Sequence, residues 1–92
     1  MKTIWKQEIP VVGEFSQDLK KDARILCIQT INDIPYIWYI VDTEEQKKEK
    51  RIFRLYGTGH TMQENVNAPD AYIGTFQMQE GVLVFHLFEV IK

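Results

Sequence analysis

The sequence contains a single cysteine, Cys27, so the chain cannot form an internal disulfide. This excludes a disulfide-stapled secreted scaffold, and a lone thiol is typical of a reducing compartment. Long apolar runs are also missing, because no stretch approaches the roughly 20 residues that a membrane helix requires. The opening residues have no apolar segment of the signal-peptide kind. We therefore expect a cytoplasmic protein without contact to a membrane.

An excess of positive charge is lacking as well. The chain has 11 Lys+Arg against 13 Asp+Glu, which gives a formal net charge of −2. Binding of polymeric nucleic acid relies on patches of cations that neutralise phosphates, so we expect no polymeric nucleic acid as a partner. Ninety-two residues, of which 45% are hydrophobic, make one domain spanning residues 1–92 with a thin core.

Residues that hold metals or act as nucleophiles are sparse. His60 and His86 fall on different predicted elements, and no metal-type spacing surrounds Cys27. Cys27 lies among apolar neighbours, which is typical of an inert packed thiol. His86 stands between Phe85 and Leu87, the setting of a core or interface histidine. We therefore expect no metal site, no cofactor and no enzymatic activity.

Short segments of β-branched and aromatic residues are abundant. They predict strands at residues 3–8, 24–31, 36–41, 51–56, 72–78 and 82–91. Turn residues 32–35 and 79–81 predict two hairpins, one joining the second and third strands and one joining the last two. The expected fold class is all-β: a small antiparallel sheet of five to six strands, curled as a barrel or sandwich, with room for one short helix or helical turn.

Three connecting segments are less regular. Residues 10–23 allow a short helix capped by Ser16 with Leu19 and Ala23 at i,i+4 spacing, or a strand end and loop broken at Gly13. Residues 42–50 carry no apolar side chain. They favour a solvated hairpin loop over one exposed helical turn. Residues 61–71 read as a long ordered loop, and loops of that length are often functional.

The predicted strands are apolar on both faces. Along residues 36–41, Tyr36, Trp38 and Ile40 alternate with the equally apolar Ile37, Tyr39 and Val41. A sheet in so short a chain covers two apolar faces either by curling on itself or by packing against another copy, and the two can coexist. We expect a homo-oligomer, a dimer or a tetramer.

The most specific local feature is the run Gly57, Thr58, Gly59 and His60. Glycines around a hydroxyl residue let several backbone N–H groups converge on one point, which is the geometry of an anion nest. A bland alternative is a strand-ending turn that needs glycine only for its backbone angles. The run is neither a dinucleotide fingerprint nor a P-loop, because the third glycine and the Gly-Lys-Ser/Thr ending are missing.

Arg54 and Tyr56 immediately precede this run and share one face of their strand. A guanidinium binds phosphate through paired hydrogen bonds, and an aromatic ring stacks on a nucleotide base. Together with the glycine run they predict a cradle for a nucleotide. The alternative is a solvated Arg–Tyr pair.

Six segments taken together resemble a known family of small proteins. They are MKTIWK at residues 1–6, ARIL at 23–26, IWYIVD at 37–42, RIFRLYGTGH at 51–60, YIGTFQ at 72–77 and VFHLFE at 84–89. The family is encoded by bacteriophages and prophages and has been catalogued as a domain of unknown function. The resemblance covers nearly the whole chain and departs at residues 16–22.

The resemblance implies a function in phage defence evasion, because the chain is similar to anti-CBASS sponge proteins. Such proteins assemble as oligomers in the bacterial host cytoplasm and sequester cyclic dinucleotide immune signals without chemistry. The residues that match the family's polar positions, and are implied to bind the ligand, are Lys6, Arg54 and the run 57–60. Tyr56 or a tryptophan is expected to stack on a base. The alternative function is an interaction protein that inhibits a host protein through an apolar sheet surface.

Overall fold

The computed structural model describes residues 1–62 and 70–91 and contains seven strands in that part. They are β1 (Lys2–Glu8), β2 (Glu14–Lys20), β3 (Arg24–Ile31), β4 (Ile34–Asp42), β5 (Lys48–Gly57), β6 (Asp70–Met78) and β7 (Leu83–Val90). The predicted all-β fold class is confirmed, whereas the predicted number of five to six strands was one or two too few. The described residues include no helix, and hence none long and apolar enough to cross a membrane.

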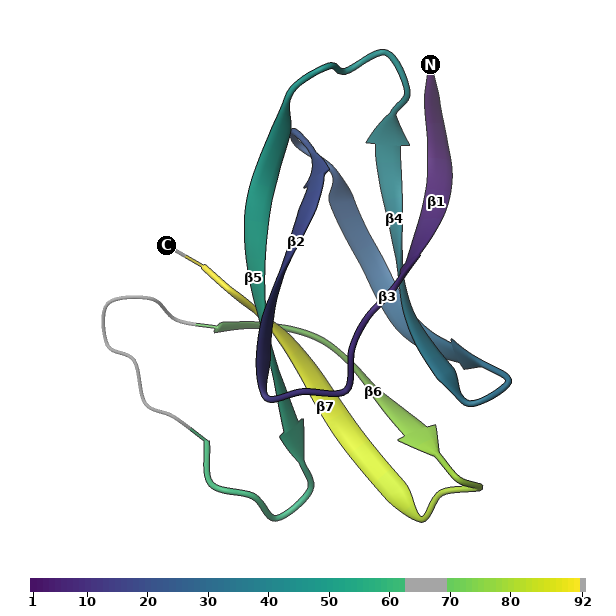
Figure 1. The fold of residues 1–92 in the computed structure, drawn as a ribbon, viewed down its shortest axis with the longest axis vertical. Helices are drawn as coiled ribbons and strands as arrows, with labels where there is room; N and C mark the ends of the chain where they lie inside the picture. The colour runs from purple at the N-terminus through teal and green to yellow at the C-terminus, as the bar shows by residue number, and fades with distance from the viewer. Residues whose placement is uncertain (63–69, 92) are drawn as a thin grey trace.

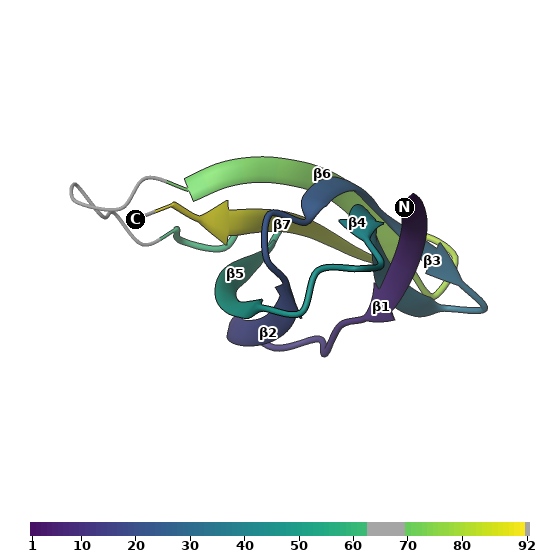
Figure 2. The ribbon, with the colours of Figure 1, turned by 90° about the horizontal axis from the view of Figure 1, so that it is seen from above.

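The strands form two antiparallel sheets that do not close into a barrel. The three-stranded sheet has the order β1-β4-β3, and the four-stranded sheet has the order β2-β5-β7-β6. Figures 1 and 2 show β2 and β5 on one side of the molecule and β1 at the rim of the other sheet. The architecture is therefore an open sandwich, one of the two arrangements expected from the sequence.

The segment from residue 10 to residue 23 contains a strand and no helix, so the helical alternative was wrong. Phe15 and Leu19 of β2 point inward, where Phe15 stacks on Phe53 with ring centroids 5.4 Å apart and Leu19 is buried. Ser16 and Asp18 face outward, and β2 pairs with β5 along its whole length. Two well-packed anchors thus hold a mostly polar edge strand in place.

The connection between β4 and β5 is also different from the prediction. These two strands do not pair, because β4 belongs to the three-stranded sheet and β5 to the four-stranded sheet. The connection therefore crosses between the sheets and is not a hairpin loop. It begins with a turn in which the Glu45 N–H donates to the Asp42 carbonyl at 3.1 Å, without a helix. The predicted loop 61–71 ends where β6 begins at Asp70, and residues 63–69 lie outside the described part.

The two predicted hairpins are confirmed. β3 pairs with β4 around Asn32 and Asp33, which both have positive φ, and β6 pairs with β7 around residues 79–81, also with positive φ. The Asp33 carboxylate accepts hydrogen bonds from the Gln79 backbone N–H at 2.9 and 3.1 Å. The tips of the two hairpins are thereby joined.

The core lies between the two sheets. Its most completely buried side chains are Ile9, Ile37, Val41, Phe53 and Leu87. In β4 the alternation expected from the sequence holds: Ile37, Tyr39 and Val41 are buried, while their outward neighbours are only partly covered.

One side of the sandwich is closed and the other is open. On the closed side β3 approaches β6 so tightly that a Cβ at Gly74 would lie 2.8 Å from Cγ2 of Ile28. On the open side β1 and β2 are the free edges of their sheets and do not pair with each other. A cavity of about 650 Å³ lies between these free edges.

Candidate functional site

Arg54 lies on the outward face of β5 and is held by two carboxylates. Its Nε donates to Glu14 Oε1 at 3.0 Å, and its Nη1 donates to the Asp70 carboxylate at 3.2 and 3.3 Å. The hydrogen bond to Glu14, followed by the charge of Asp70, raises the pKa of the Arg54 guanidinium. Only 12% of the Arg54 side chain is exposed.

The charge around Arg54 is therefore negative and not positive. One guanidinium stands against two carboxylates, which gives a local sum of −1. A phosphate approaching Arg54 would meet the oxygens of Glu14 and Asp70 at close range, where like charges repel. Arg54 fastens β2 and β6 to β5, and its donors are directed at the protein's own oxygens.

Two backbone N–H groups of the corner formed by residues 57–60 already donate to carbonyls of the protein. The Thr58 N–H donates to the Val84 carbonyl at 3.2 Å, and the His60 N–H donates to the Gly57 carbonyl at 3.0 Å. Gly59 has a φ of +86°, a conformation that favours glycine. The side chain of His60 lies against Gly57, where an added Cβ would be 2.7 Å from the imidazole. These contacts explain both glycines without a ligand.

Tyr56 belongs to an aromatic row on the outward face of the four-stranded sheet. Its ring meets Phe88 edge-on with centroids 5.8 Å apart, and Phe88 in turn contacts Tyr72 at 5.4 Å. The Tyr56 hydroxyl is buried and has no hydrogen-bond partner among residues 1–62 and 70–91. The ring is therefore packed among aromatic neighbours and offers little free face for stacking.

A chain of hydroxyls around His86 was not predicted from the sequence. Its Nε2 lies 2.7 Å from Thr58 Oγ1 and its Nδ1 lies 2.9 Å from Thr75 Oγ1, which is 2.6 Å from the Tyr72 hydroxyl. His86 thus lies on the outward face, not in the core, and ties three segments together. The sequence pattern could have indicated this position, because His86 alternates with Leu87 along the strand. Leu87 is fully buried, so His86 lies on the outward face.

The predicted binding residues divide between separate cavities. Arg54, Tyr56 and His60 line a cavity of about 420 Å³, and Gly57, Thr58 and His60 line another of about 300 Å³. Lys6 lines neither of them. It borders the larger cavity of about 650 Å³ on the open side of the sandwich.

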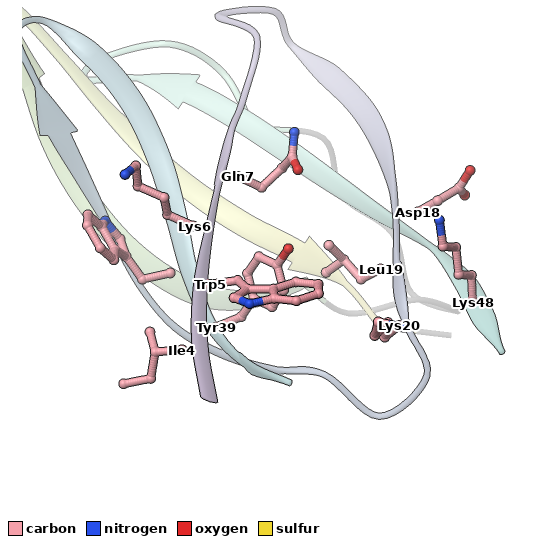
Figure 3. A pocket seen from close by; sticks show the side chains of 10 residues that line it. Ile4, Trp5, Lys6, Gln7, Asp18, Leu19, Lys20, Tyr39 and Lys48 are labelled. Carbon is pink, nitrogen blue, oxygen red and sulfur yellow. The ribbon is translucent and has the colours of Figure 1, made fainter. Parts of the chain in front are cut away.

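This larger cavity, the β1–β2 cleft, has an aromatic floor. It is lined by Ile4, Trp5, Lys6, Gln7, Asp18, Leu19, Lys20, Trp38, Tyr39 and Lys48. Figure 3 shows the Trp5 indole directed from β1 toward Tyr39 and Leu19, which are both buried. The Trp5 side chain remains 42% exposed, so one large ring faces the cleft. Burial raises the pKa of the Tyr39 phenol, which stays a neutral hydroxyl.

Positive charge gathers around the β1–β2 cleft. Lys6, Lys20 and Lys48 border it, against the single carboxylate of Asp18. Within residues 1–62 and 70–91, none of these three lysines forms a salt bridge with a described carboxylate. Lys20 Nζ donates instead to the Glu45 carbonyl at 2.5 Å. The local sum is +2, the reverse of the environment of Arg54.

Lys6 reaches across the outward face of the three-stranded sheet. Its Nζ lies 5.7 Å from the ring centroids of both Tyr36 and Trp38, within the range of cation–π attraction. In Figure 3 its side chain extends from β1 to the side opposite Trp5. Lys6 therefore borders the cleft from β1, but its ammonium lies on the outward face, across β1 from the Trp5 ring, where no described carboxylate neutralises it.

Metal ligands do not gather in the described part of the chain. Over residues 1–62 and 70–91, no three His, Cys, Asp or Glu residues lie close enough to hold a metal ion. The carboxylates of Glu14 and Asp70 both accept hydrogen bonds from Arg54.

A family model for a domain of unknown function, DUF7352, matches residues 1–92. The chain belongs to the DUF7352 family. No curated protein and no solved structure matches it.

Three residues of this DUF7352 domain were missed as binding candidates: Trp5, Lys20 and Lys48. Trp5 stands next to Lys6 in β1, and alternation along a strand predicts that the two side chains lie on opposite faces. Its position at an open edge follows from strand order, which no local pattern in the sequence provides. Lys20 and Lys48 are register partners on β2 and β5, and residues 10–23 had not been recognised as a strand.

Proposed function

We propose that this DUF7352 domain is a non-catalytic binding protein for a small anionic nucleotide, with the β1–β2 cleft as its site. The observation that supports this most strongly is a half-exposed indole facing a cleft bordered by three lysines and one carboxylate. Base stacking on such a ring contributes about 1–3 kcal/mol. Ammonium groups free of carboxylate partners are available to phosphate oxygens.

Electrostatics favours the β1–β2 cleft over the predicted corner near Arg54. The cleft carries a local charge of +2, and the surroundings of Arg54 carry −1. Two unit charges 4 Å apart interact by about 4 kcal/mol at the dielectric typical of a protein surface. A dianion is thus attracted by the cleft and repelled by Glu14 and Asp70. Of the predicted binding residues, Lys6 borders this cleft, although its ammonium lies over Tyr36 and Trp38 on the outward face.

The proposed mechanism is stoichiometric removal of the ligand from solution. A protein in excess over a scarce signal lowers the free signal without turnover. A nanomolar dissociation constant, about −12 kcal/mol, is enough for this. The finer role implied by the resemblance is that of a phage protein, acting in the bacterial host cytoplasm, that removes a cyclic dinucleotide of an anti-phage defence system.

Isothermal titration calorimetry against a panel of cyclic di- and trinucleotides tests the proposal. We expect saturable heat with at least one of them at micromolar protein. The ligand recovered after denaturation of the protein should be chemically unchanged, since no step breaks a bond. Absence of heat with every nucleotide would contradict the proposal. Recovery of a cleaved ligand would show that the protein is an enzyme and not a binding protein.

Two sets of variants locate the site. Lys20→Ala combined with Lys48→Ala should weaken binding by about tenfold or more, because two charge-assisted contacts are lost. Thr58→Ala and His60→Ala, exposed residues of the corner, should leave the affinity unchanged. If the corner variants abolish binding and the lysine variants do not, the site lies at the corner and the cleft assignment is wrong.

A second candidate function has one specific observation in its favour. The outward face of the three-stranded sheet exposes Ile4, Ile31 and Ile34 around the half-buried Tyr36 and Trp38. Exposed apolar surface of this kind is typical of protein interaction sites. Binding of a host protein by this face predicts that Ile31→Lys, together with Ile34→Lys, abolishes a pull-down from host lysate. The same variant should leave nucleotide binding intact.

A further inference from the structure

β1 is an edge strand that is exposed along its whole length. It pairs with β4 on one side only, and every residue from Lys2 to Glu8 is classed as exposed. In Figure 1 it runs along the rim of the molecule with no strand on its outer side. Edge strands of soluble proteins are usually shortened, bulged or covered, because unpaired backbone groups bind other strands. β1 has seven residues paired in regular register and no such protection.

The register of β1 determines which backbone groups are unpaired. The Met1 carbonyl accepts from the Thr43 N–H at 2.9 Å, and the Ile9 N–H donates to the Pro35 carbonyl at 3.1 Å. In an antiparallel pair, alternate residues direct their N–H and C=O toward the partner strand. Odd-numbered residues of β1 therefore face β4. The N–H and C=O groups of Lys2, Ile4, Lys6 and Glu8 point outward at the free edge.

We infer that two copies of this chain pair through β1, antiparallel, about a two-fold axis at Trp5. In this arrangement Lys2 lies opposite Glu8 of the second copy, Ile4 lies opposite Lys6, and Trp5 lies opposite itself. The outward N–H and C=O groups of both strands then meet as hydrogen-bonded pairs, and Trp5 occupies a non-hydrogen-bonded pair. The two three-stranded sheets become one continuous six-stranded sheet.

Charge selects this register over its neighbours. Two ion pairs form on the outward face, because Lys2 meets Glu8 at each end of the paired strands. A shift by two residues in one direction places Lys2 opposite Lys6, and a shift in the other direction places Lys6 opposite itself. Like charges directly opposite each other destabilise a strand pair. A symmetric pairing centred on Trp5 thus satisfies both the backbone and the side chains.

The second copy adds a residue to the β1–β2 cleft. Trp5 lines the cleft from the inner face of β1 and is the largest exposed ring there. In a non-hydrogen-bonded pair the two Cα atoms are about 4.5 Å apart, so the indole of the second copy lies beside the first. Aromatic pairs across strands are stabilising. The two clefts of the dimer therefore meet at a shared aromatic wall.

A cross-linking experiment tests the register without any ligand. Trp5→Cys in a Cys27→Ser background places two thiols within disulfide distance across the axis. Oxidation should give a covalent dimer of twice 10.9 kDa on non-reducing electrophoresis. Thr3→Cys in the same background is the matched control, since the two thiols would be four residues apart, about 13 Å. Cross-linking at both positions, or at neither, would overturn the assigned pairing.

A charge-reversal experiment supplies a second arm for the full chain. Lys2→Glu and Glu8→Lys each turn both ion pairs into repulsive pairs, so each variant alone should dissociate about tenfold more readily. A mixture of the two should form a heterodimer, because the introduced carboxylate at position 2 faces the introduced ammonium at position 8. Lys47→Glu, an exposed residue outside β1, changes the net charge equally and should not affect association.

Sedimentation velocity measures the wild-type chain, the three variants and the mixture, and circular dichroism confirms that each variant is folded. A wild-type chain that stays monomeric at every concentration, or variants that fail to associate when mixed, would overturn the inference. A monomer that still binds nucleotide would refute the dimer and leave the proposed function intact. If β1 binds a different protein instead, the purified chain should be a monomer that does not cross-link at position 5, and this result would overturn the pairing.

Discussion

At Gly74 the fold leaves no space for a side chain. β6 carries a bulge between Tyr72 and Gly74, and an added Cβ would lie 2.8 Å from Cγ2 of the buried Ile28. Because Ile28 is packed in the core, it cannot move aside freely. We expect Gly74→Ala to destabilise the protein by about 1–3 kcal/mol, the usual cost of overpacking.

Gly13 provides the control for this prediction. A Cβ there meets nothing within 4 Å, and its φ is not in the left-handed region, so Gly13→Ala should change stability by less than about 0.5 kcal/mol. Urea unfolding monitored by tryptophan fluorescence measures both variants. Equal midpoints for the two variants would show that β3 and β6 are farther apart than described.

Two arginines on β5 illustrate how burial determines how much an ion pair contributes to the free energy of unfolding. Arg51 binds Glu89 through two bonds of 2.6 and 2.8 Å, and both side chains are less than one-fifth exposed. Arg54 binds Glu14, whose side chain is 57% exposed. Removing one partner of a buried pair leaves an uncompensated charge, whereas a surface pair contributes little.

From this contrast we predict the effect of two matched substitutions. Glu89→Gln should destabilise the protein by about 2–3 kcal/mol, because the mostly buried Arg51 loses the carboxylate that accepts both of its hydrogen bonds. Glu14→Gln should cost less than about 1 kcal/mol, since Arg54 keeps Asp70. Urea unfolding at neutral pH compares them. A larger loss for Glu14→Gln would mean that the order of burial at these two sites is reversed.

At the scale of elements, β1 is fastened through Met1, the residue that precedes it. The N-terminal amine of Met1 lies 3.0 Å from Glu44 Oε2 and 3.2 Å from Asp42 Oδ1. The pKa of the amine is raised by Glu44 first and Asp42 second. The pKa of Asp42 is lowered by the Glu44 backbone N–H first and by the amine second. These contacts join the start of β1 to the end of β4.

The signs of these pKa shifts predict two pH limits. A raised amine pKa means that its stabilisation is complete below the ordinary value near 8 and disappears as pH rises through the folded value. A lowered carboxyl pKa means that the stabilisation from Asp42 is present above about 3.8 and disappears as pH falls through the folded value. The attachment of β1 should therefore be firmest between these limits.

Acetylation of the N-terminus tests the upper limit. Raising the pH from about 7 to about 10 should lower the urea midpoint of the native chain more than that of the acetylated chain, because only the native chain has an amine to deprotonate. The acetylated chain controls for the titration of lysines and tyrosines. Parallel loss in both chains would show that the amine does not hold β1.

Sequence patterns predicted the strands whose composition is clearly that of a strand and whose ends carry turn residues. Residues 24–31 and 36–41 are rich in β-branched and aromatic side chains, and their turn residues 32 and 33 tolerate positive φ. β2 escaped prediction because only Phe15 and Leu19 anchor it, and three polar residues lie between them. An edge strand with one buried face needs no more than that, and the same spacing also fits a helical turn.

The candidate site was less predictable because its parts depend on pairing between distant strands. Arg54 and Tyr56 were recognised by residue type, but the carboxylates that occupy Arg54 come from β2 and β6. Lys6 was identified, whereas the exposed ring beside it was not. No local pattern shows that β1 and β2 are free edges, since strand order is a property of the assembled sheets.

At the scale of the whole molecule, the sandwich is asymmetric. The closed side brings β3 against β6, and the open side leaves two sheet edges and the β1–β2 cleft. The central strands β4, β5 and β7 each pair on both sides. Their backbone amide protons therefore exchange with solvent only through extensive unfolding. β1 pairs once and exposes all seven of its residues. Stability should therefore fall from the centre toward the open side.

Amide hydrogen exchange distinguishes a free open side from one covered by a second copy. In an isolated chain, Thr3, Trp5 and Gln7 face β4 and should be moderately protected. Lys2, Ile4 and Lys6 face outward and should exchange at nearly the unprotected rate. Pairing of β1 with a second copy adds partners for the outward amides alone. Their protection should then rise with protein concentration, while that of the inward amides changes little.

Comparison of exchange at two widely separated protein concentrations isolates this effect, because local unfolding of a single chain does not depend on concentration. Lys2→Glu supplies the reference, since it weakens pairing without removing a backbone donor. We expect its outward amides to remain unprotected at the concentration where those of the native chain are protected. Outward amides that exchange freely in both chains at every concentration would show that β1 stays a bare edge. The free backbone groups and the exposed indole would then be available to a different partner.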